Sequence, residues 1–294
     1  MPDAPLLMAV PNVSEGRDTD VLEAIERAFH PAAFLDIHLD ADHGRAVFTL
    51  AATQGRLAEA LVAGAREVVE RVDLNRHEGL HPRVGALDVM PVVYLDEERR
   101  GAACAEALTA AALIGEELEL PVFLYGDLAT RPEHRERAPL REGGWRALAE
   151  RLESGELRPD YGPARIHPTA GALLVAARPP LIAFNLDLVT DDVEVARRIA
   201  RGLRERDGGL PGVRALGLFL PSRGRAQVST NVHDYKATPL HAIVEAVREQ
   251  AEVAEAELVG LAPEAAFEGF PDDLPVRGFS PERHLIENAL RTVR

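Results

Sequence analysis

The sequence predicts an α+β protein built from two β-α-β-β-α-β units in tandem. Strand-like and helix-like hydrophobic periodicities follow one another in the same order twice along the chain. Its 294 residues exceed the length of about 100 to 200 residues that is usual for one domain. A stretch rich in glycine and proline, residues 159–180, separates the two repeats. This element order is that of the ferredoxin-like plait, an antiparallel sheet with both helices on one face, so we expect two such subdomains, residues 1–178 and 179–294.

In the first repeat, a short apolar run is followed by a segment in which Val21, Leu22, Ile25 and Phe29 recur at helical spacing. Two strand-like runs, an amphipathic helical segment and a further apolar strand complete the unit. The predicted elements are strand 6–10, helix 18–30, strands 33–38 and 46–51, helix 54–72 and strand 87–95. A helix at 97–118, a strand at 121–125 and a helix at 145–154 are predicted to extend it.

The second repeat begins near Leu181. Its predicted elements are strand 181–188, helix 192–205, strands 213–219 and 226–232, helix 239–254 and strand 257–261. Between the repeats, Gly and Pro at positions 162–163 and 179–180 interrupt regular structure, so we predict that residues 159–180 form a linker that lines a cleft. A last helix is predicted to begin at Ser280, with this serine as its N-cap and Pro281 in its first position.

The composition argues against several classes of function. Hydrophobic residues form 46% of the chain and charged residues 28%, as in a folded, soluble protein. The net charge of -15 would repel a phosphate backbone, so no nucleic acid is expected as a partner. The apolar runs are shorter than the roughly 20 residues that span a membrane, and the first residues lack the pattern of a secretory signal. We therefore expect a cytoplasmic protein, with no membrane partner, that acts on small molecules. Cys104 is the only cysteine, which excludes an internal disulfide and a thiolate zinc cluster.

Residues 77–81, His-Glu-Gly-Leu-His, match the H-E-x-x-H string of zinc peptidases. That mechanism needs both histidines on one face of a continuous helix. Gly79 weakens a helix by about 1 kcal/mol, and Pro82 keeps the residue before it out of the helical region, so the imidazoles should not align and His77 is predicted to be a solvated loop residue. The same Pro82 fixes an extended backbone at His81, in a loop where a side chain can reach a ligand. On these residues alone, His81 is either a catalytic group or a structural or exposed histidine.

Residues 81–91, His-Pro-Arg-Val-Gly-Ala-Leu-Asp-Val-Met-Pro, closely resemble the signature of the glutamate formiminotransferases, the folate enzymes of histidine breakdown. Five further motifs are similar in the same order: the family's opening loop, its fifth strand, its folate-contacting linker, the strand beyond that linker and a strand of its second lobe. They correspond to residues 10–17, 121–126, 162–171, 177–185 and 226–231. The resemblance covers about residues 8–262.

The resemblance implies two α/β subdomains whose sheets face each other across a substrate tunnel. It implies that the formimino group of N-formimino-L-glutamate moves to N5 of tetrahydrofolate, with His81 as the general acid/base, tetrahydrofolate as co-substrate and no metal. Imidazole suits this role because its unperturbed pKa of about 6.5 lets it accept and return a proton near neutral pH. A homodimer is expected from the resemblance. At this length we expect the transferase alone, without the cyclodeaminase domain of animal relatives.

Carboxylates on both substrates favour local arginines, and Arg83 and Arg178 are the candidates; a surface or interdomain ion pair is the alternative for each. Asn12, Ser14 and Glu15 lie where a strand passes into a helix, and the backbone N–H groups there either bind an anion or are simply capped. 

Gln227 and Asn231 lie on the polar face of a predicted strand and either point into the cleft or form structural hydrogen bonds. The resemblance also assigns folate contacts to a continuous segment. Its residues are Gly162, Pro163, Ala164, Arg165, Ile166, His167, Pro168, Thr169, Ala170 and Gly171.

The cluster Asp36, His38, Asp40, Asp42 and His43 departs most from the animal relatives, which carry Asp-x-Asp at its start. Asp40 is the candidate for a substrate-binding residue and an acidic partner of His81. The five side chains could also hold a metal or lie on the solvated face of a hairpin.

Three other functions remain open on the sequence. Formyl transfer between 5-formyltetrahydrofolate and glutamate would use the same site. A folate- or amino-acid-binding module without turnover would use the same fold, because fold alone does not settle function. A zinc hydrolase is the third, and metal analysis of the purified protein would test it.

Overall fold

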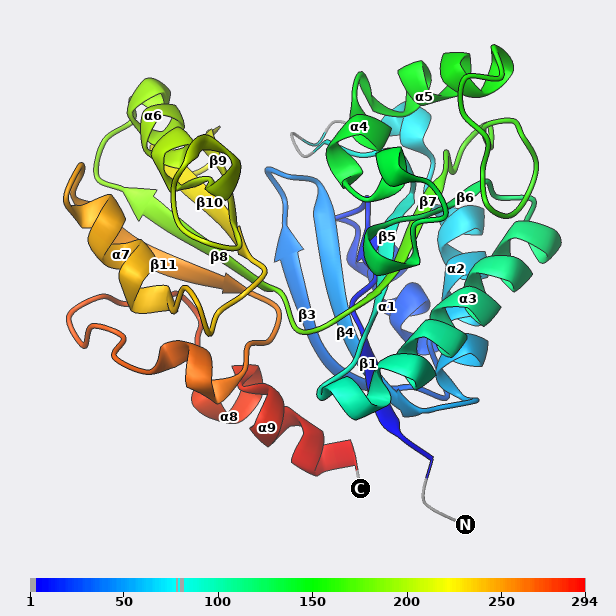
Figure 1. The fold of residues 1–294 in the computed structure, drawn as a ribbon, viewed down its shortest axis with the longest axis horizontal. Coiled ribbons are helices and arrows are strands. Elements are labelled where there is room, and N and C mark those ends of the chain that lie inside the picture. Colours follow the sequence, from blue (N-terminus) through cyan, green and yellow to red (C-terminus); the bar gives the residue numbers. More distant parts are fainter. Residues whose placement is uncertain (1–3, 78, 80–81, 294) are drawn as a thin grey trace. The chain divides into compact units, whose positions relative to one another are not determined.

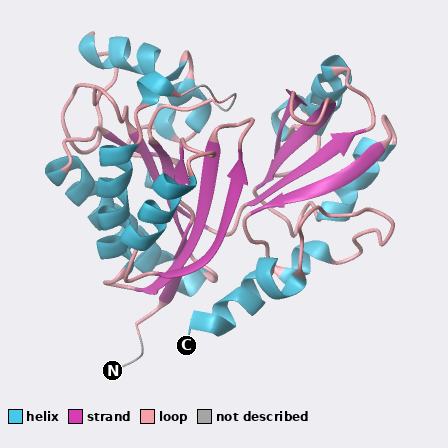
Figure 2. Ribbon diagram, turned by 180° about the vertical axis from the view of Figure 1, so that it is seen from behind, coloured by secondary structure: helices cyan, strands magenta, loops and turns pink. Residues whose placement is uncertain are grey.

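The computed structural model describes residues 4–77, 79 and 82–293. The chain divides into two compact units, Met1–Pro179 and Pro180–Arg294, each built on its own sheet (Figures 1 and 2). Within the described ranges, no helix combines the length and the apolar character needed to cross a bilayer.

Among its described residues, the first unit contains a seven-stranded sheet and five α-helices. Its strands are β1 (Leu6–Ala9), β2 (Asn12–Val13), β3 (Ala33–Asp40), β4 (Arg45–Thr53), β5 (Leu87–Val93), β6 (Val122–Leu124) and β7 (Leu173–Arg178). Its helices are α1 (Thr19–Ala28), α2 (Leu57–Arg71), α3 (Arg100–Glu117), α4 (Arg137–Arg141) and α5 (Gly144–Glu153). Short 3₁₀ turns follow several of these elements, among them η1 (Leu74–Arg76).

The predicted plait forms the centre of this sheet. β4 pairs antiparallel with β1 and β2 on one side and with β3 on the other, and β5 pairs antiparallel with β1 and β2. Alternate residues of each strand point to the helices, so Ala46, Phe48 and Leu50 of β4 are fully buried beneath them. The expected α+β class and β-α-β-β-α-β order are confirmed for this unit.

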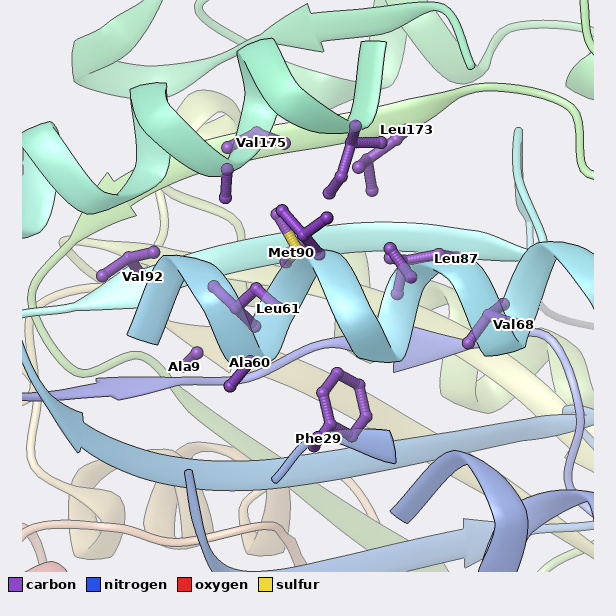
Figure 3. Close-up of a cluster of buried hydrophobic side chains, with 14 of the residues drawn as sticks. Ala9, Phe29, Ala60, Leu61, Val68, Leu87, Met90, Val92, Leu173 and Val175 are labelled. Carbon is purple, nitrogen blue, oxygen red and sulfur yellow. The ribbon is translucent and has the colours of Figure 1, made fainter. Parts of the chain in front are cut away.

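The core of the unit lies between the sheet and α1, α2 and α3. Figure 3 shows Leu61 of α2 between Met90 and Leu87 of β5 and Ala9 of β1, with Phe29 below α2. These side chains are fully buried, and burial of each large one contributes roughly 1.5 to 3 kcal/mol. The helix faces that make this contact are the ones that the hydrophobic spacing predicted.

The predicted linker, residues 159–180, is partly wrong because its last part forms strand β7. Residues 173–178 are not a connection between the units: they form a parallel strand inserted between β5 and β6. The signal was a continuous apolar run, which is typical of a parallel strand buried on both faces. The linker was predicted from Gly162-Pro163 and Pro179-Pro180, which lie before and after this strand but not within it.

Helices α4 and α5 cover part of the opposite face of the sheet. Leu140, Leu148 and Leu152 pack there against Phe123 and Leu174. Arg137 of α4 lies over the ring of Tyr125, so this segment also covers the carboxyl end of β6.

The second unit is a plait of four strands. Its elements are β8 (Ile182–Leu188), α6 (Val193–Leu203), β9 (Val213–Leu220), β10 (Arg225–Val232), α7 (Leu240–Arg248) and β11 (Val253–Val259). The order across the sheet is β11-β8-β10-β9 and every pairing is antiparallel. Ile199 of α6 and Ile243 of α7 are fully buried against Phe184 and Val228, so both helices lie on one face, as predicted.

Two boundaries in this unit differ from the prediction. Helix α7 ends at Arg248 rather than 254, and β11 begins at Val253 rather than 257. The alanines and glutamates of this stretch have high helix and low strand propensity, but pairing with β8 decides the conformation.

The predicted last helix is broken. It forms α8 (Pro281–His284), α9 (Ile286–Ala289) and η7 (Leu290–Val293). Leu285 between them is extended because His284 and Ile286 hydrogen-bond with the backbone of Ala262. Ser280 precedes α8, but its side chain donates to Glu282 and does not cap the helix.

Candidate functional site

The loop between η1 and β5 carries the H-P-R motif. His81, with Glu78 and Leu80, lies outside the described residues, while His77, Gly79 and residues 82–86 are described. The described parts of this loop show how it is held on both sides of His81.

His77 is anchored on the amino-terminal side. Its Nε2 lies 2.7 Å from the carbonyl oxygen of Gly44, and its Nδ1 accepts a hydrogen bond of 2.9 Å from the N–H of Gly79. Since Nδ1 accepts, the ring is neutral and Nε2 donates to Gly44. Burial lowers the pKa of His77, which favours this neutral form. The prediction of a solvated loop residue is therefore wrong: His77 is a partly buried brace of the loop.

The backbones of the two loops approach closely here. A Cβ on Gly79 would lie 2.1 Å from the carbonyl oxygen of His43, and one on Gly44 would lie 2.8 Å from Cε1 of His77. Gly44 also has a φ of +59°, which other residues rarely adopt. Glycine at both positions is required for the loop of His81 to lie against the β3–β4 turn.

Asp40 and His43 form a pair in that turn. The backbone N–H of His43 donates to Asp40 Oδ1 over 2.9 Å, and the ring Nδ1 lies 2.7 Å from Oδ2. Burial alone would raise the pKa of Asp40, but the hydrogen bonds from His43 hold it well below its usual range. Asp40 thus binds His43, and its predicted pairing with His81 stays a prediction. No set of three or more metal-binding side chains comes together within the described part of the chain.

The second half of the predicted folate segment anchors the loop on the carboxyl-terminal side. The turn His167–Gly171 is closed by backbone hydrogen bonds of 3.0 and 3.1 Å between these two residues. Its Ala170 carbonyl accepts from the N–H of Ala86, and Thr169 accepts from Leu74. The turn therefore contacts the chain both before and after His81.

Two glycines make this contact possible. A Cβ on Gly85 would lie 1.9 Å from the carbonyl oxygen of Ala172, and one on Gly171, whose φ is +72°, would lie 2.2 Å from that of Val84. Both obstacles are backbone atoms that cannot swing away, so this crossing admits no side chain.

The first half of the segment lies farther along the sheet. The backbone before Gly162 pairs with Val122, and Arg165 forms an exposed ion pair of 2.9 Å with Glu119. Ile166 packs against the small core under α4 and α5. The structure thus brings His167, Pro168, Thr169, Ala170 and Gly171 to the loop of His81, and places Arg165 in a surface contact.

The predicted anion site before α1 is filled by the chain itself. Oε1 of Glu15 accepts hydrogen bonds from the N–H groups of Gly16, Arg17 and Asp18, over 2.7 to 3.1 Å. This is the capping alternative that the sequence left open. Ser14 donates to the carbonyl of Gly85 over 2.7 Å, which ties this loop to the H-P-R segment as well.

Asn12 has a local role in the same stretch. Its side chain donates to the carbonyl oxygen of Val10 over 2.9 Å. A substrate contact from Asn12, Ser14 or Glu15 stays a prediction.

The two predicted arginines take different positions. Arg83 donates to the carbonyl oxygens of Gly79 and His77, over 2.8 and 3.3 Å, and so helps to shape the loop. Arg178 ends β7, donates to the carbonyl of Pro179 over 3.0 Å and hydrogen-bonds with Tyr125. Burial lowers its pKa to about 10.

Three arginines that the sequence analysis missed lie near Arg178. Arg141 pairs with the buried carboxylate of Asp88, which also accepts from the N–H of Val84 over 2.8 Å. Arg137 stacks on Tyr125, and burial together with the charge of Arg141 lowers the pKa of Arg45 to about 10. These residues come from distant segments without a shared motif, so only the fold brings them together.

In the second unit, Gln227 and Asn231 lie on the sheet face opposite α6 and α7. Gln227 is fully buried and its amide donates to Asp187 Oδ1 over 2.7 Å. Arg223 donates to Asp187 over 2.9 Å, and Asn185 donates to Glu257 over 3.0 Å. Gln227 therefore has the structural hydrogen bond that the sequence left as the alternative, while a substrate contact of Gln227 or Asn231 stays a prediction.

Comparison with known proteins agrees with the motifs. Residues 6–178 match the family model of the formiminotransferase domain, N-terminal subdomain, and residues 183–269 match that of the formiminotransferase domain. The chain is 35% identical over 296 residues to a glutamate formimidoyltransferase of Streptococcus pyogenes, covering 98% of this chain and 99% of the relative. A glutamate formimidoyltransferase of Thermoplasma acidophilum is 36% identical, with 89% of each chain covered.

The formimidoyltransferase-cyclodeaminase of Gallus gallus is 38% identical over 281 residues, which are 90% of this chain but 51% of that longer protein. The matches thus extend over both sheets and over the loops that hold the H-P-R segment. The chain belongs to the formiminotransferase family.

Proposed function

We propose that this chain transfers the formimino group of N-formimino-L-glutamate to N5 of tetrahydrofolate, with His81 as general acid/base. The products are 5-formiminotetrahydrofolate and L-glutamate, as in histidine degradation. Family membership over both units, with 35% identity to a named glutamate formimidoyltransferase, is the observation that carries the proposal.

The reaction needs one group that first accepts a proton and then donates it. N5 attacks the formimino carbon and forms the new C–N bond while it loses its proton. The bond from that carbon to the glutamate nitrogen then breaks, and this nitrogen gains a proton. An imidazole can take the first proton and return it to the leaving amine, so no net proton or electron is exchanged.

The loops around His81 support this role. His77 and Gly79 hold the chain before it, and the turn at 167–171 holds the chain at both ends of the loop. A catalytic side chain must be kept near its productive position, and rigid anchors on both sides serve that purpose. We assign the folate contacts to residues 162–171 as part of the same proposal.

The direct test mixes the protein with tetrahydrofolate and formiminoglutamate, acidifies the mixture and records methenyltetrahydrofolate absorbance. We expect signal from the wild type and a loss of about 100- to 10,000-fold in turnover for His81→Ala. His241→Ala, which removes an imidazole from α7 in the second unit, is the control and should keep turnover within about twofold. Near-normal turnover in a folded His81→Ala protein contradicts the role of His81.

Two of the three alternatives, formyl transfer and the binding module, are separated by this assay together with calorimetry. Signal with N-formyl-L-glutamate and tetrahydrofolate, but none with formiminoglutamate, indicates formyl transfer, because acid converts the 5-formyltetrahydrofolate formed into methenyltetrahydrofolate. Folate binding by calorimetry without turnover, unchanged in His81→Ala, indicates a binding module.

A further inference from the structure

Four arginines of the first unit lie on the side of the sheet opposite α1, α2 and α3. Arg45 and Arg141 are near Asp88, and Arg137 and Arg178 are near Tyr125. Arg178 is the last residue of β7, and Tyr125 directly follows β6, where its backbone N–H donates to the carbonyl of Val175 over 2.9 Å. Arg137 and Arg141 come from α4, and Arg45 begins β4. We call these four residues the arginine cluster.

Direct contacts hold the arginine cluster together. Arg141 pairs with Asp88, whose side chain is 2% exposed. The Arg137 guanidinium lies 5.5 Å from the centre of the Tyr125 ring, and Arg178 hydrogen-bonds with the same tyrosine. One tyrosine and one aspartate therefore position three guanidinium groups.

The charges in this cluster repel one another. Burial is the main cause that lowers the pKa of Arg45, Arg141 and Arg178, and the neighbouring Arg137 lowers all three further. The pKa of about 10 for Arg45 and Arg178 is still far above neutral pH, and arginine is not deprotonated in proteins under such conditions. Nε of Arg141 is buried and has no hydrogen-bond partner among the described residues. An anion with two or more oxygen atoms would relieve the repulsion and occupy such donors.

We propose that the arginine cluster binds the two carboxylates of the glutamyl donor. This rests on the proposed function and adds the residues that select the donor. Guanidinium groups match carboxylates in a bidentate geometry, and a dicarboxylate supplies two such partners. A chain with a net charge of -15 must concentrate cations locally to attract this substrate.

The donor is favoured over the folate tail because of where the cluster lies along the chain. Asp88, the partner of Arg141, accepts from the N–H of Val84, only three residues after His81. This contact connects the segment that directly follows His81 in the sequence to Asp88 and Arg141. Both carboxylates of formiminoglutamate are a few bonds from its reacting nitrogen. The glutamyl tail of folate is separated from N5 by the rest of the pteridine, a methylene group and the aminobenzoyl ring.

The first experiment measures binding by calorimetry without tetrahydrofolate. The probes are L-glutamate and L-glutamine, which lacks the second carboxylate. We expect L-glutamate to bind at least about tenfold more tightly than L-glutamine, and Arg137→Gln and Arg178→Gln to weaken L-glutamate binding about 10- to 100-fold. The affinity of Arg137→Lys for L-glutamate should lie between those of the wild type and Arg137→Gln. Lysine keeps the positive charge but cannot form the bidentate hydrogen bonds of a guanidinium group. Arg141 is left unchanged because its loss would leave Asp88 buried without its partner.

Arg146→Gln is the matched control. Arg146 also lies over an aromatic ring, 5.6 Å from the centre of Trp145, but it is exposed and outside the cluster. The affinity of Arg146→Gln for L-glutamate should be within about twofold of that of the wild type.

The second experiment determines KM for each substrate in the transferase assay. A rise of about 10- to 100-fold in KM for formiminoglutamate, with KM for tetrahydrofolate nearly unchanged, supports the proposal. A rise confined to KM for tetrahydrofolate assigns the cluster to the folate tail and overturns it. Wild-type binding of L-glutamate by the folded Arg137→Gln and Arg178→Gln proteins overturns it as well. If the wild type binds L-glutamate through these arginines but transfers no formimino group, the proposed function fails while the carboxylate site stands.

Discussion

The two plaits share one strand order but differ in the charge that they place on the sheet face away from the helices. In the first unit, Arg45 and Arg178 of that face both lie near Arg137, and the carboxylate of Asp88 pairs with Arg141. In the second, the carboxylates Asp187 and Glu257 are each bound by arginine and amide groups. The comparison teaches that one backbone frame supports a region suited to an anionic ligand and a region that satisfies its own charges. Substitutions in each unit can test this contrast.

The largest expected effect on stability concerns the close approach of two backbone segments in the first unit, where Gly85 lies against Ala172 and Gly171 against Val84. Gly85→Ala would place a methyl group 1.9 Å from the carbonyl oxygen of Ala172, so the strands must move apart. We expect the free energy of unfolding to fall by about 3 to 5 kcal/mol, measured by urea denaturation.

The matched control is Gly224→Ala in the β9–β10 turn of the second unit. Gly224 has a φ of +61° but nothing lies within 4 Å of its added Cβ. Gly224→Ala should lower the free energy of unfolding by only about 1 to 2 kcal/mol, because backbone strain is its only cost. Equal losses in the two variants would show that the crossing is not the tighter of the two sites.

An intermediate effect is expected from the buried charges of the second unit. Asp187 is 1% exposed and accepts from both Arg223 and Gln227. Asp187→Asn removes the charge that pairs with Arg223, and we expect a loss of about 2 to 3 kcal/mol in the free energy of unfolding.

Asp273→Asn provides the comparison within the same unit. Asp273 pairs with Arg248 over 3.0 Å, but its side chain is 73% exposed. A surface pair of this kind contributes less than about 1 kcal/mol. If Asp187→Asn were no more costly than Asp273→Asn, the network would not be the stabilising element described above.

The smallest effect is a pH dependence in the first unit. His77 and His167 both accept a backbone N–H through Nδ1, and burial is the main cause that lowers the pKa of each. Because the folded pKa lies below the unfolded value of about 6.5, the stabilisation is complete above pH 6.5 and is lost as the pH falls through the folded pKa. Each contribution should be less than about 1 kcal/mol, since both side chains are only partly buried and solvent screens their charge.

Unfolding between pH 7.5 and 5 and hydrogen exchange of Gly79 and Ala170 check this prediction. In the wild type, both amides should lose protection as the pH falls. His77→Asn and His167→Asn keep an acceptor oxygen near the position of Nδ1 but do not titrate, so their stability should vary less with pH. An unaltered pH dependence in the double variant would rule out these two histidines as its cause.

Much of the fold could be predicted because the spacing of apolar residues within short segments indicates the helices and strands. The helical spacing of Val21, Leu22, Ile25 and Phe29 predicts α1, and the same element order in both halves predicts two plaits. Strand β7 escaped because burial on both faces removes the alternation by which strands are recognised. The boundary between α7 and β11 escaped because strand pairing overrides the helix propensity of alanine and glutamate.

The candidate site was only partly predictable for a similar reason. The H-P-R motif and the segment 167–171 are local signals, and the structure brings the described parts of both together. Arg45, Arg137 and Arg141 belong to no motif and meet only after β4, α4 and β7 are assembled. The role of His77 was also hidden, because its two partners come from the β3–β4 turn and from Gly79 of its own loop.

The position of β7 has a consequence for how the protein is made. This strand fills the place between β5 and β6 although it is synthesised after both. Until the ribosome has released the chain beyond Arg178, β5 and β6 each present an unpaired apolar edge, the kind of edge that pairs with neighbouring chains. The nascent first half is thus most prone to aggregation shortly before it is complete, and its folding waits for the strand that arrives last.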